Sequence, residues 1–358
     1  MDFRENAMKS RQGKTSAEQT VDLMRLAEIV EQFRGKKIVL YGDFVADEFQ
    51  YGDISRVSRE APVLILKHRE TKLVPGGGAN ATNNLAALGA KVSPVTAVGS
   101  DAAGEALTEY FRGLGVDTSG IVRVPNWTTP TKTRFLAGWA HTTAQQVLRV
   151  DREPGVPVPD KAKTQVGAKL VAKLRGAHAL AVSDYGFGAA SPQDLRKAVQ
   201  GVRSKIPVTL DARQGLTRYA GAGVGFATPN EAELEAIHHA TIGKNMDELE
   251  RCGSATLASM KLRSLLVTRG RDGMALFEHG SKHSTQIAVH GSDQAIDVTG
   301  AGDTVLAAFT LALASGASPL EAAHVANIAG GLVVMKRGTA TVTQVELLET
   351  IRRESSGS

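Results

Sequence analysis

The pattern that most constrains the fold of this chain is an alternation of short apolar runs with stretches of helical periodicity. Each run has the composition of a strand and ends in polar or small residues. The runs are KIVLYG (37–42), KVSPVTAVG (91–99), HALAVSD (178–184), PVTLDA (207–212), GFATPN (225–230) and SLLVTRG (264–270). This order predicts a doubly wound α/β domain, with a mainly parallel sheet flanked by helices.

Polar side chains occupy the ends of these runs. In open parallel sheets, ligands bind beyond the carboxyl ends of the strands. We therefore expect the functional site at this edge, where the sequence places Asp43, Asp184, Asp211, Asn230 and Arg269.

Two segments break the alternation within the main domain, which we expect over residues 35–354. Residues 49–68 and 130–151 lack a helical period, and each is typical of a pair of β-strands. They fit a small β-sheet lid that projects from the main domain, and they fit ordinary surface hairpins equally well.

The first 34 residues are predicted to form an N-terminal extension with a short helix. An amphipathic stretch covers residues 20–33, where Val21, Met24 and Val30 are expected to share one face. We interpret this helix as a packing element rather than a membrane anchor.

Composition narrows the environment and the partners. The single cysteine, Cys252, excludes an internal disulfide and a cysteine-based zinc site, which fits a cytoplasmic protein. No run reaches the ~20 apolar residues of a membrane-spanning helix. The net charge is only +5, with both signs mixed along the chain. We therefore expect a small anionic substrate rather than nucleic acid or a membrane.

The glycine-rich segment DVTGAGDTV, residues 297–305, precedes a helical stretch. Its glycines would let backbone N–H groups converge ahead of the helix, where an anion is stabilised. Asp303 adds a carboxylate at the same point. If the anion is a phosphoryl group in transfer, Asp303 would accept the proton of the attacking hydroxyl. A plain helix cap is an equally good interpretation of Asp303.

A second glycine-rich segment, PGGGAN, covers residues 75–80. The missing side chains of Gly77 and Gly78 would let a ligand approach the backbone, and Asn80 could bond sugar hydroxyls. Three glycines also fit a flexible loop.

The segment TPNEAEL, residues 228–234, contains Asn230 and Glu233 at a strand-to-helix junction. An amide and a carboxylate at this spacing could hold hydrated Mg²⁺ on a nucleotide. Ordinary polarity at a helix start explains the pair as well.

Together, the segments at 75–80, 230–233 and 297–304 resemble the motifs of the ribokinase/PfkB family of carbohydrate kinases. The resemblance covers roughly Lys36 to Thr343. It implies a ribokinase-like fold, ATP and Mg²⁺ as cofactors, and phosphoryl transfer to a sugar hydroxyl.

The resemblance also implies roles for individual residues. Asp303 matches the catalytic base, and the backbone of Gly300, Ala301 and Gly302 matches the anion hole. The implied sugar contacts are Asp47, Gly77, Gly78 and Asn80. The implied nucleotide contacts are Asn230, Glu233, Thr268, Gly270, Gly273 and Asn327, with Glu233 acting on Mg²⁺ through water. Asp297 and Thr299 match positions that hold a monovalent cation such as K⁺ in some members.

Within the family, ISRVSREAPV (54–63) is similar to the lid strands of kinases that act on D-glycero-β-D-manno-heptose 7-phosphate. This implies phosphorylation of the anomeric hydroxyl to the 1,7-bisphosphate, in ADP-heptose and lipopolysaccharide core biosynthesis. Because the chain ends soon after the kinase region, we expect a stand-alone kinase. Gly78 and Arg213 depart from the usual Ala and Lys.

Two alternatives stay open. The first is another sugar, sugar-phosphate or nucleoside kinase of the same family. The second is a non-catalytic sugar-binding regulator, which the intact Asp303 and its glycine loop disfavour, because a pure binder needs no base.

The substrate's own phosphate calls for positive charge. Arg134 and Arg149 lie in the second lid segment, with Lys132 beside them. Arg can hold a phosphate through two N–H groups, although these residues also fit solvated strand charges. An isolated hairpin is marginal in water, and lids in this family often pair, so we expect a homodimer joined through the lids.

Overall fold

The computed structural model describes residues 21–139, 144–202, 205–291 and 295–357. Its large sheet has the strand order β13-β12-β11-β10-β9-β8-β1-β4-β5. The strands from β11 to β5 are parallel, whereas β12 and β13 are antiparallel to their neighbours. In chain order the bounds are β1 Lys37–Gly42, β4 Lys91–Gly99, β5 Ile121–Val124, β8 Ala179–Asp184, β9 Val208–Ala212, β10 Phe226–Ala227, β11 Ser264–Thr268, β12 Met274–Glu278 and β13 Thr285–Ile287.

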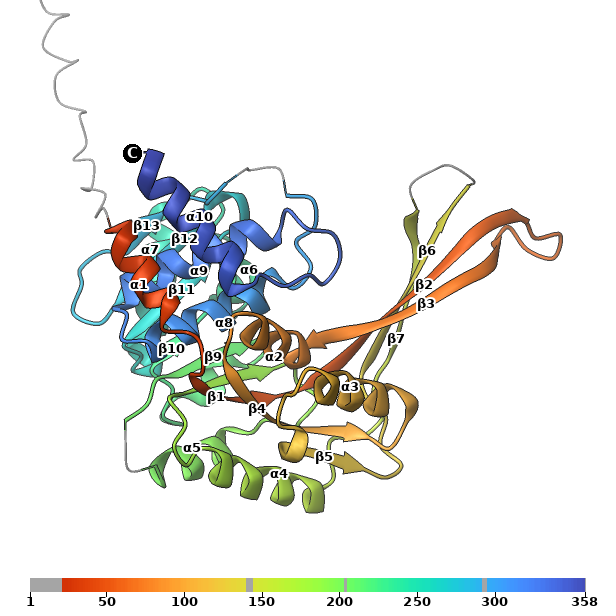
Figure 1. Cartoon of the computed structure of the whole chain (residues 1–358), viewed down its shortest axis with the longest axis horizontal. Coiled ribbons are helices and arrows are strands. Elements are labelled where there is room, and N and C mark those ends of the chain that lie inside the picture. The colour runs from red at the N-terminus through yellow and green to blue at the C-terminus, as the bar shows by residue number, and fades with distance from the viewer. Residues whose placement is uncertain (1–20, 140–143, 203–204, 292–294, 358) are drawn as a thin grey trace, which may run out of the picture.

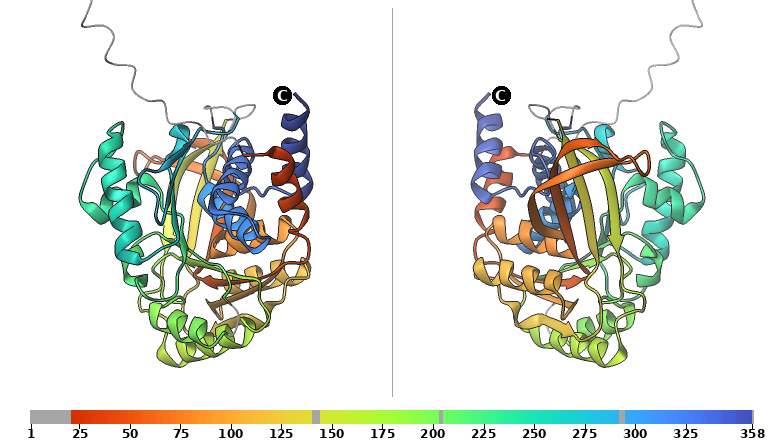
Figure 2. Two further views of the ribbon diagram at one scale, coloured as in Figure 1. Left: turned by 90° about the vertical axis from the view of Figure 1, so that its left-hand side faces the viewer. Right: turned by 90° about the vertical axis from the view of Figure 1, so that its right-hand side faces the viewer.

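Each of the six apolar runs contains one of these strands, so the predicted fold class is confirmed. Helices cover both faces of the sheet (Figure 2). They are α1 Leu23–Glu31, α2 Gly78–Ala87, α3 Ala102–Gly113, α4 Asp160–Lys173, α5 Pro192–Gln200, α6 Glu231–His238, α7 Met246–Met260, α8 Ala301–Ala314, α9 Pro319–Val333 and α10 Gln344–Gly357. None of these described helices is long and apolar enough to cross a lipid bilayer.

The core lies on the two faces of the sheet. Along β1, Ile38 and Leu40 pack toward α2, α8 and α9, whereas Val39 and Tyr41 pack toward α4 and α5. A strand that is buried on both faces must be apolar at every position, which explains the continuous runs in the sequence.

The short helix α1 belongs to the core. Leu26, Ile29 and Val30 are fully buried, and the helix packs against α10. The expected face was wrong in one respect, because Met24 is 59% exposed. The boundary between an extension and a kinase domain stays a prediction, and residues 1–20 lie outside the described part of the chain.

A second sheet projects from the body (Figure 1). Its strand order is β3-β2-β6-β7, with bounds β2 Phe44–Val57, β3 Leu64–Gly77, β6 Thr131–Gly138 and β7 Gln145–Arg152. Because β2 pairs with β6 in parallel, the two segments form one sheet and not separate hairpins. Residues 140–143 of the expected second segment are outside the described residues.

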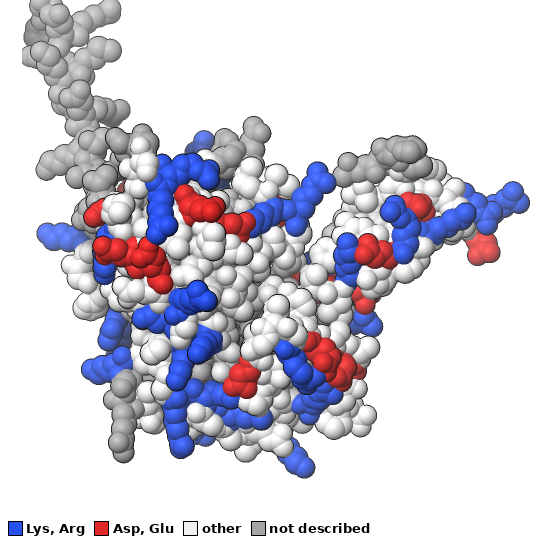
Figure 3. Space-filling view, viewed as in Figure 1, with Lys and Arg blue, Asp and Glu red and all other residues white. Residues whose placement is uncertain are grey.

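The lid sheet, as we call these four strands, begins at the edge where the body strands end. Only Asp43 separates β1 from β2, and β3 continues directly into α2. Figure 3 shows basic and acidic side chains intermixed over the lid sheet and over the same face of the body.

Candidate active site

The N-terminus of α8 forms the centre of the site. Gly300 is its N-cap with φ of 80°, and a Cβ there would lie 2.4 Å from the Asn80 amide nitrogen. Glycine is therefore required both by the backbone and by the close approach of α2. Asp303 lies in the first turn, and no side chain caps this helix, so the plain helix-cap interpretation of Asp303 is wrong.

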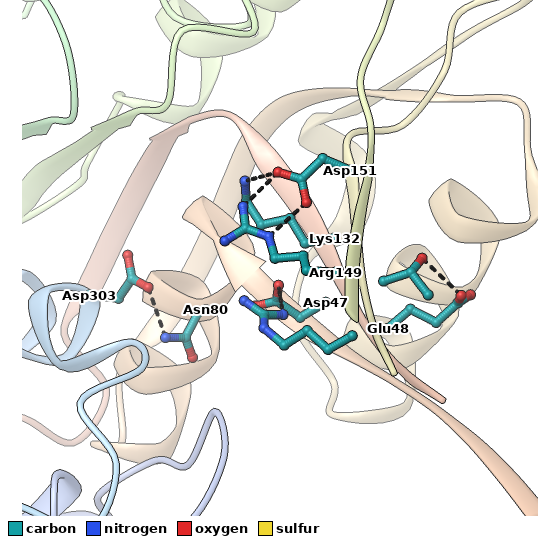
Figure 4. Close-up of polar contacts among 9 residues, drawn as sticks. Asp47, Glu48, Asn80, Lys132, Arg149, Asp151 and Asp303 are labelled. Atoms are coloured by element: carbon teal, nitrogen blue, oxygen red, sulfur yellow. Dashed lines mark hydrogen bonds and ion pairs between the residues drawn. The ribbon is translucent and has the colours of Figure 1, made fainter. Parts of the chain in front are cut away.

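The Asp303 carboxylate is buried and accepts two hydrogen bonds. Asn80 donates to Oδ2 at 2.8 Å (Figure 4), and the Tyr185 hydroxyl donates to Oδ1 at 3.1 Å. Burial raises the pKa of Asp303 to about 7, although these two hydrogen bonds act in the opposite direction. A carboxylate with this pKa can accept a proton near neutral pH.

The first backbone N–H groups of α8 point out of the helix end, as in any α-helix. The N–H of Ala301 donates to the Val298 carbonyl at 3.2 Å. Among the described residues, no acceptor pairs with the N–H groups of Gly302 and Asp303. The helix end therefore offers two N–H donors, beside the carboxylate, to an anion.

A cavity of about 400 Å³ opens on one side of this helix end. It brings together the residues expected to contact the nucleotide from β11, the turn after it and α9, namely Thr268, Gly270, Gly273 and Asn327. Ala301 and Gly302 also line it. Its other walls are largely apolar, from residues that the sequence alone did not single out, such as Met274, Val289 and Val334.

Asn230 and Glu233 do not line this cavity among the described residues. They form a capping box, in which each side chain accepts the other's backbone N–H, at 2.8 and 3.0 Å. Glu233 is also electrostatically close to Asp211. Burial, followed by the negative charges of Glu233 and Asp303, raises the pKa of Asp211 well above its ordinary value.

Asp297 and Thr299 lie in the turn before α8. The Asp297 carboxylate accepts the N–H groups of Thr299 and Gly338, both at 2.9 Å. Burial alone would raise the pKa of Asp297, but these hydrogen bonds outweigh it and the pKa is lowered. No three His, Cys, Asp or Glu side chains cluster as a metal site within the described ranges.

A second cavity, of about 490 Å³, lies between the lid sheet and the loops after β8 and β9. Lys132, Arg149 and Arg213 bring positive charge to it, and Tyr185 forms part of its wall. Asp151 sits among the cations: Arg149 bonds both of its oxygens, at 2.7 and 2.6 Å (Figure 4). The Arg149 guanidinium holds the pKa of Asp151 below its ordinary value, so Asp151 remains charged.

The expected group of basic residues is therefore divided. Lys132 and Arg149 line the second cavity. Among the described residues, Arg134 does not line it and instead donates a hydrogen bond to Asp47 at 2.6 Å. Gly76 makes room for Asp47, because a Cβ there would lie 2.5 Å from its carboxylate. Gly78 donates its N–H to the Asp43 carbonyl, and a Cβ on Gly78 would come within 2.8 Å of that oxygen.

Sequence reasoning missed Tyr185 and Arg213 as site residues. Each is the first residue after a strand that ends in or next to an aspartate. Tyr185 follows β8 in the segment SDYG, and Arg213 follows β9 in the segment LDAR. Their position at strand ends was the signal that could have identified them.

Comparisons with known proteins agree with this geometry. Residues 36–345 match the model of a family described as pfkB family carbohydrate kinase. The bifunctional protein HldE of Geobacter metallireducens is 37% identical over 324 residues, which cover 89% of this chain and 64% of that protein. HldE of Mesorhizobium japonicum is 36% identical over 331 residues, which cover 92% of this chain and 64% of that protein. The chain thus spans less than two thirds of the length of either relative.

Solved structures share the fold. Phosphofructokinase-2 from Escherichia coli in complex with potassium aligns with a TM-score of 0.70 at 18% identity, covering 90% of this chain and 99% of that one. Ribokinase from Arabidopsis thaliana, complexed with ribose and ATP, aligns with a TM-score of 0.66 at 21% identity, covering 89% and 99%.

The raised pKa of Asp303 predicts a pH-dependent gain in stability for Asp303→Asn. Its pKa is about 7 in the folded protein, against an ordinary value of 3.8. Ionisation therefore favours the unfolded chain, and stability is lost as pH rises through this window. Asn cannot ionise, so the variant should melt at a higher temperature than the parent at pH 8, with little difference at pH 4.

The control is Asp117→Asn. Burial would raise the pKa of Asp117, but hydrogen bonds from Lys173 and Ser119 lower it to about 2. This variant should lose stability at pH 8. A melting difference for Asp303→Asn that is the same at both pH values would contradict the assignment of a raised pKa.

Proposed function

This chain belongs to the pfkB family of carbohydrate kinases, and on that premise we propose that it phosphorylates the anomeric hydroxyl of D-glycero-β-D-manno-heptose 7-phosphate. As a member of the family it is an ATP-dependent sugar kinase. The observation that carries the choice of reaction is the buried Asp303 carboxylate, which lies in the same helix turn as two open N–H groups and next to Gly302 of the cavity wall.

The transfer follows from this arrangement. The anomeric oxygen attacks the γ-phosphorus of ATP and forms a new P–O bond, while the bond from that phosphorus to the bridging oxygen breaks. ADP leaves with the bonding electron pair, and Asp303 takes the hydroxyl proton. The N–H groups of Gly302 and Asp303 stabilise the charge on the phosphoryl oxygens.

The residues at the end of β9 and the start of α6 suit Mg²⁺. Asp211 has no hydrogen-bond donor among the described residues, and its charge lies near that of Glu233. Mg²⁺ is typically held by one or two carboxylates together with the phosphates of a nucleotide. Glu233 and Asp211 would hold it, directly or through water, and the ion would neutralise charge on the ATP phosphates.

Asp297 and Thr299 are the proposed site for a monovalent cation such as K⁺. The lowered pKa of Asp297 keeps its carboxylate charged, and it lies in the turn that leads into the catalytic helix.

The choice of a sugar phosphate rests on the second cavity. Lys132, Arg149 and Arg213 line it, against the carboxylates of Asp151 and Glu153. This excess of positive charge suits a phosphate group. The similarity to HldE proteins and to lid strands of heptose 7-phosphate kinases supports a heptose 7-phosphate, with Asp47, Gly77, Gly78 and Asn80 on the sugar side. We expect this reaction to be a step of ADP-heptose synthesis in the cytoplasm.

Asp303→Asn should lower kcat by about two to four orders of magnitude, because the amide cannot accept the proton. Binding of ATP and of heptose 7-phosphate, measured by calorimetry, should persist. Asp117→Asn serves as the matched control and should keep the parent kcat, because Asp117 caps the turn before β5 and lines neither cavity. A near-normal kcat in Asp303→Asn would refute the role of Asp303 as the base.

Arg149→Ala should raise the KM for heptose 7-phosphate by about tenfold or more, the usual effect of losing hydrogen bonds to a charged group. The KM for ATP should stay nearly constant, because Arg149 does not line the nucleotide cavity. Arg152→Ala provides a control on the same strand, since Arg152 is 56% exposed and pairs with Glu48. If the KM for heptose 7-phosphate is the same in Arg149→Ala and the parent, Arg149 does not bind the substrate phosphate.

The lid sheet exposes apolar side chains that a second copy of the chain could cover. Leu148 is 55% exposed and Val57 is 57% exposed. Large apolar side chains left exposed on a projecting sheet are candidates for an interface between copies, so we expect a homodimer joined through the lid sheets. Light scattering at micromolar concentration should report a dimer, which Leu148→Glu should dissociate and Val345→Glu on α10 should not. A fully active monomer in the parent protein would rule out this dimer.

A further inference from the structure

The Asp303 carboxylate is held from two sides by different parts of the chain. Asn80 comes from the first turn of α2 and bonds Oδ2, whereas Tyr185 comes from the loop after β8 and bonds Oδ1. Each carboxylate oxygen therefore has one fixed donor, and the plane of the carboxylate is set by the pair.

The backbone of Tyr185 is itself fixed. The buried Asp43 carboxylate accepts the N–H groups of Tyr185, Phe187 and Ala189 at 2.9, 3.0 and 2.8 Å. Three hydrogen bonds to one buried carboxylate hold the loop in a single conformation. Asp43 therefore anchors the backbone of Tyr185, and Asp303 anchors its hydroxyl.

The ring of Tyr185 connects the base to the second cavity. Tyr185 lines that cavity together with Arg149 and Arg213, and the Arg213 guanidinium lies 6.0 Å from the ring centroid. Tyr185 thus stands between the cations proposed to bind the substrate phosphate and the carboxylate proposed to receive the hydroxyl proton.

We propose that Tyr185 is a positioning residue for phosphoryl transfer, whose hydroxyl orients the Asp303 carboxylate toward the attacking hydroxyl and keeps it ionised. This inference rests on the proposed role of Asp303 as the base. Tyr185 does not exchange a proton itself: burial, followed by the negative charges of Asp303 and Asp211, raises the pKa of Tyr185 well above its ordinary value, so it stays a donor.

The charges around Asp303 set the direction of the expected pH effect. Burial and the negative charge of Asp47 on β2 raise the pKa of Asp303, and the hydrogen bonds from Asn80 and Tyr185 lower it. Asp211 at the end of β9 also faces Asp303. The nearby cations are engaged elsewhere, since Arg134 bonds Asp47 and Arg213 lies over Tyr185. The neutral donors Asn80 and Tyr185 therefore counteract the rise in the pKa of Asp303 that burial causes.

Removing the Tyr185 hydroxyl should favour the protonated form of the Asp303 carboxyl group over the ionised form. The base works only when ionised, so kcat falls as pH is lowered through the pKa of about 7. Loss of a donor raises that pKa further, and the acid limb of the kcat profile moves to higher pH.

The test is Tyr185→Phe, which keeps the ring and removes one oxygen. We expect kcat with ATP and heptose 7-phosphate to fall about tenfold at pH 7, as for the loss of a hydrogen bond to a charged group. Activity should recover in part at pH 9, and the KM for ATP should not change, because Tyr185 lies outside the nucleotide cavity.

Tyr219→Phe is the matched control. It also loses a hydroxyl that donates to a buried carboxylate, that of Asp184 at 2.7 Å, but it does not contact Asp303. Its acid limb should coincide with that of the parent. Melting temperatures of both variants show whether either has lost its fold.

A second measurement works without substrate. With ¹³C-labelled aspartate, the carboxyl signal of Asp303 is assigned by its absence in Asp303→Asn and then titrated by NMR. Tyr185→Phe should move its midpoint to higher pH. An unmoved midpoint together with an unmoved acid limb would overturn the inference, even if the kinetic role of Asp303 stands. A normal kcat in Asp303→Asn would instead defeat the proposed function, and the positioning role with it.

Discussion

The contact between α2 and α8 is the interaction on which the site depends. Besides the bond from Asn80 to Asp303, the Thr304 hydroxyl donates to Asn84 at 2.9 Å, and Asn84 donates to the Asn80 carbonyl at 3.0 Å. These groups are buried, where an unsatisfied polar atom is strongly destabilising. The two glycine-rich segments, more than 200 residues apart in the sequence, are therefore held in one relative position. That position fixes the proposed base, Asp303, with respect to both cavities.

The site gathers negative charge at the edge of a parallel sheet, and the fold stabilises it mainly with backbone donors. Asp43 receives three N–H groups, Asp297 receives two, and Asp303 receives two side-chain donors. Such donors are fixed by the fold and do not neutralise the carboxylates. The remaining negative potential is available to bind cations, while the open end of α8 can bind an anion only a few residues away.

Much of this could be predicted from the sequence, and the part that could not has a physical cause. Continuous apolar runs identified the body strands because both faces of the sheet are buried. The segment around Asp303 could be identified from its glycines, because a close approach and a positive φ demand glycine at position 300. Gly270 was implied only by the family resemblance, although its positive φ also favours glycine. Strand register was not accessible: the pairing that sets Lys132 opposite Asp151, and Arg134 opposite Arg149, follows from the whole lid sheet. The two-residue period of a strand shows which side chains share a face, but it does not show which residues of the neighbouring strand they pair with.

The continuity of the strands has a consequence for how the substrate enters. Strands β2 and β3 of the lid sheet join the body without a linker, because β1 passes into β2 through Asp43 alone and β3 passes into α2, whereas loops 125–130 and 153–159 connect β6 and β7 to the body. The half that carries Asp47 is therefore tied to the body by continuous strands. Pairing between β2 and β3 shifts register at Tyr51/Gly52 and again at Ile54/Arg56, and such irregularities let strands bend. To open the site, the outer parts of β2 and β3 would bend at these register shifts, away from Asp47. The whole sheet would not rotate about its base.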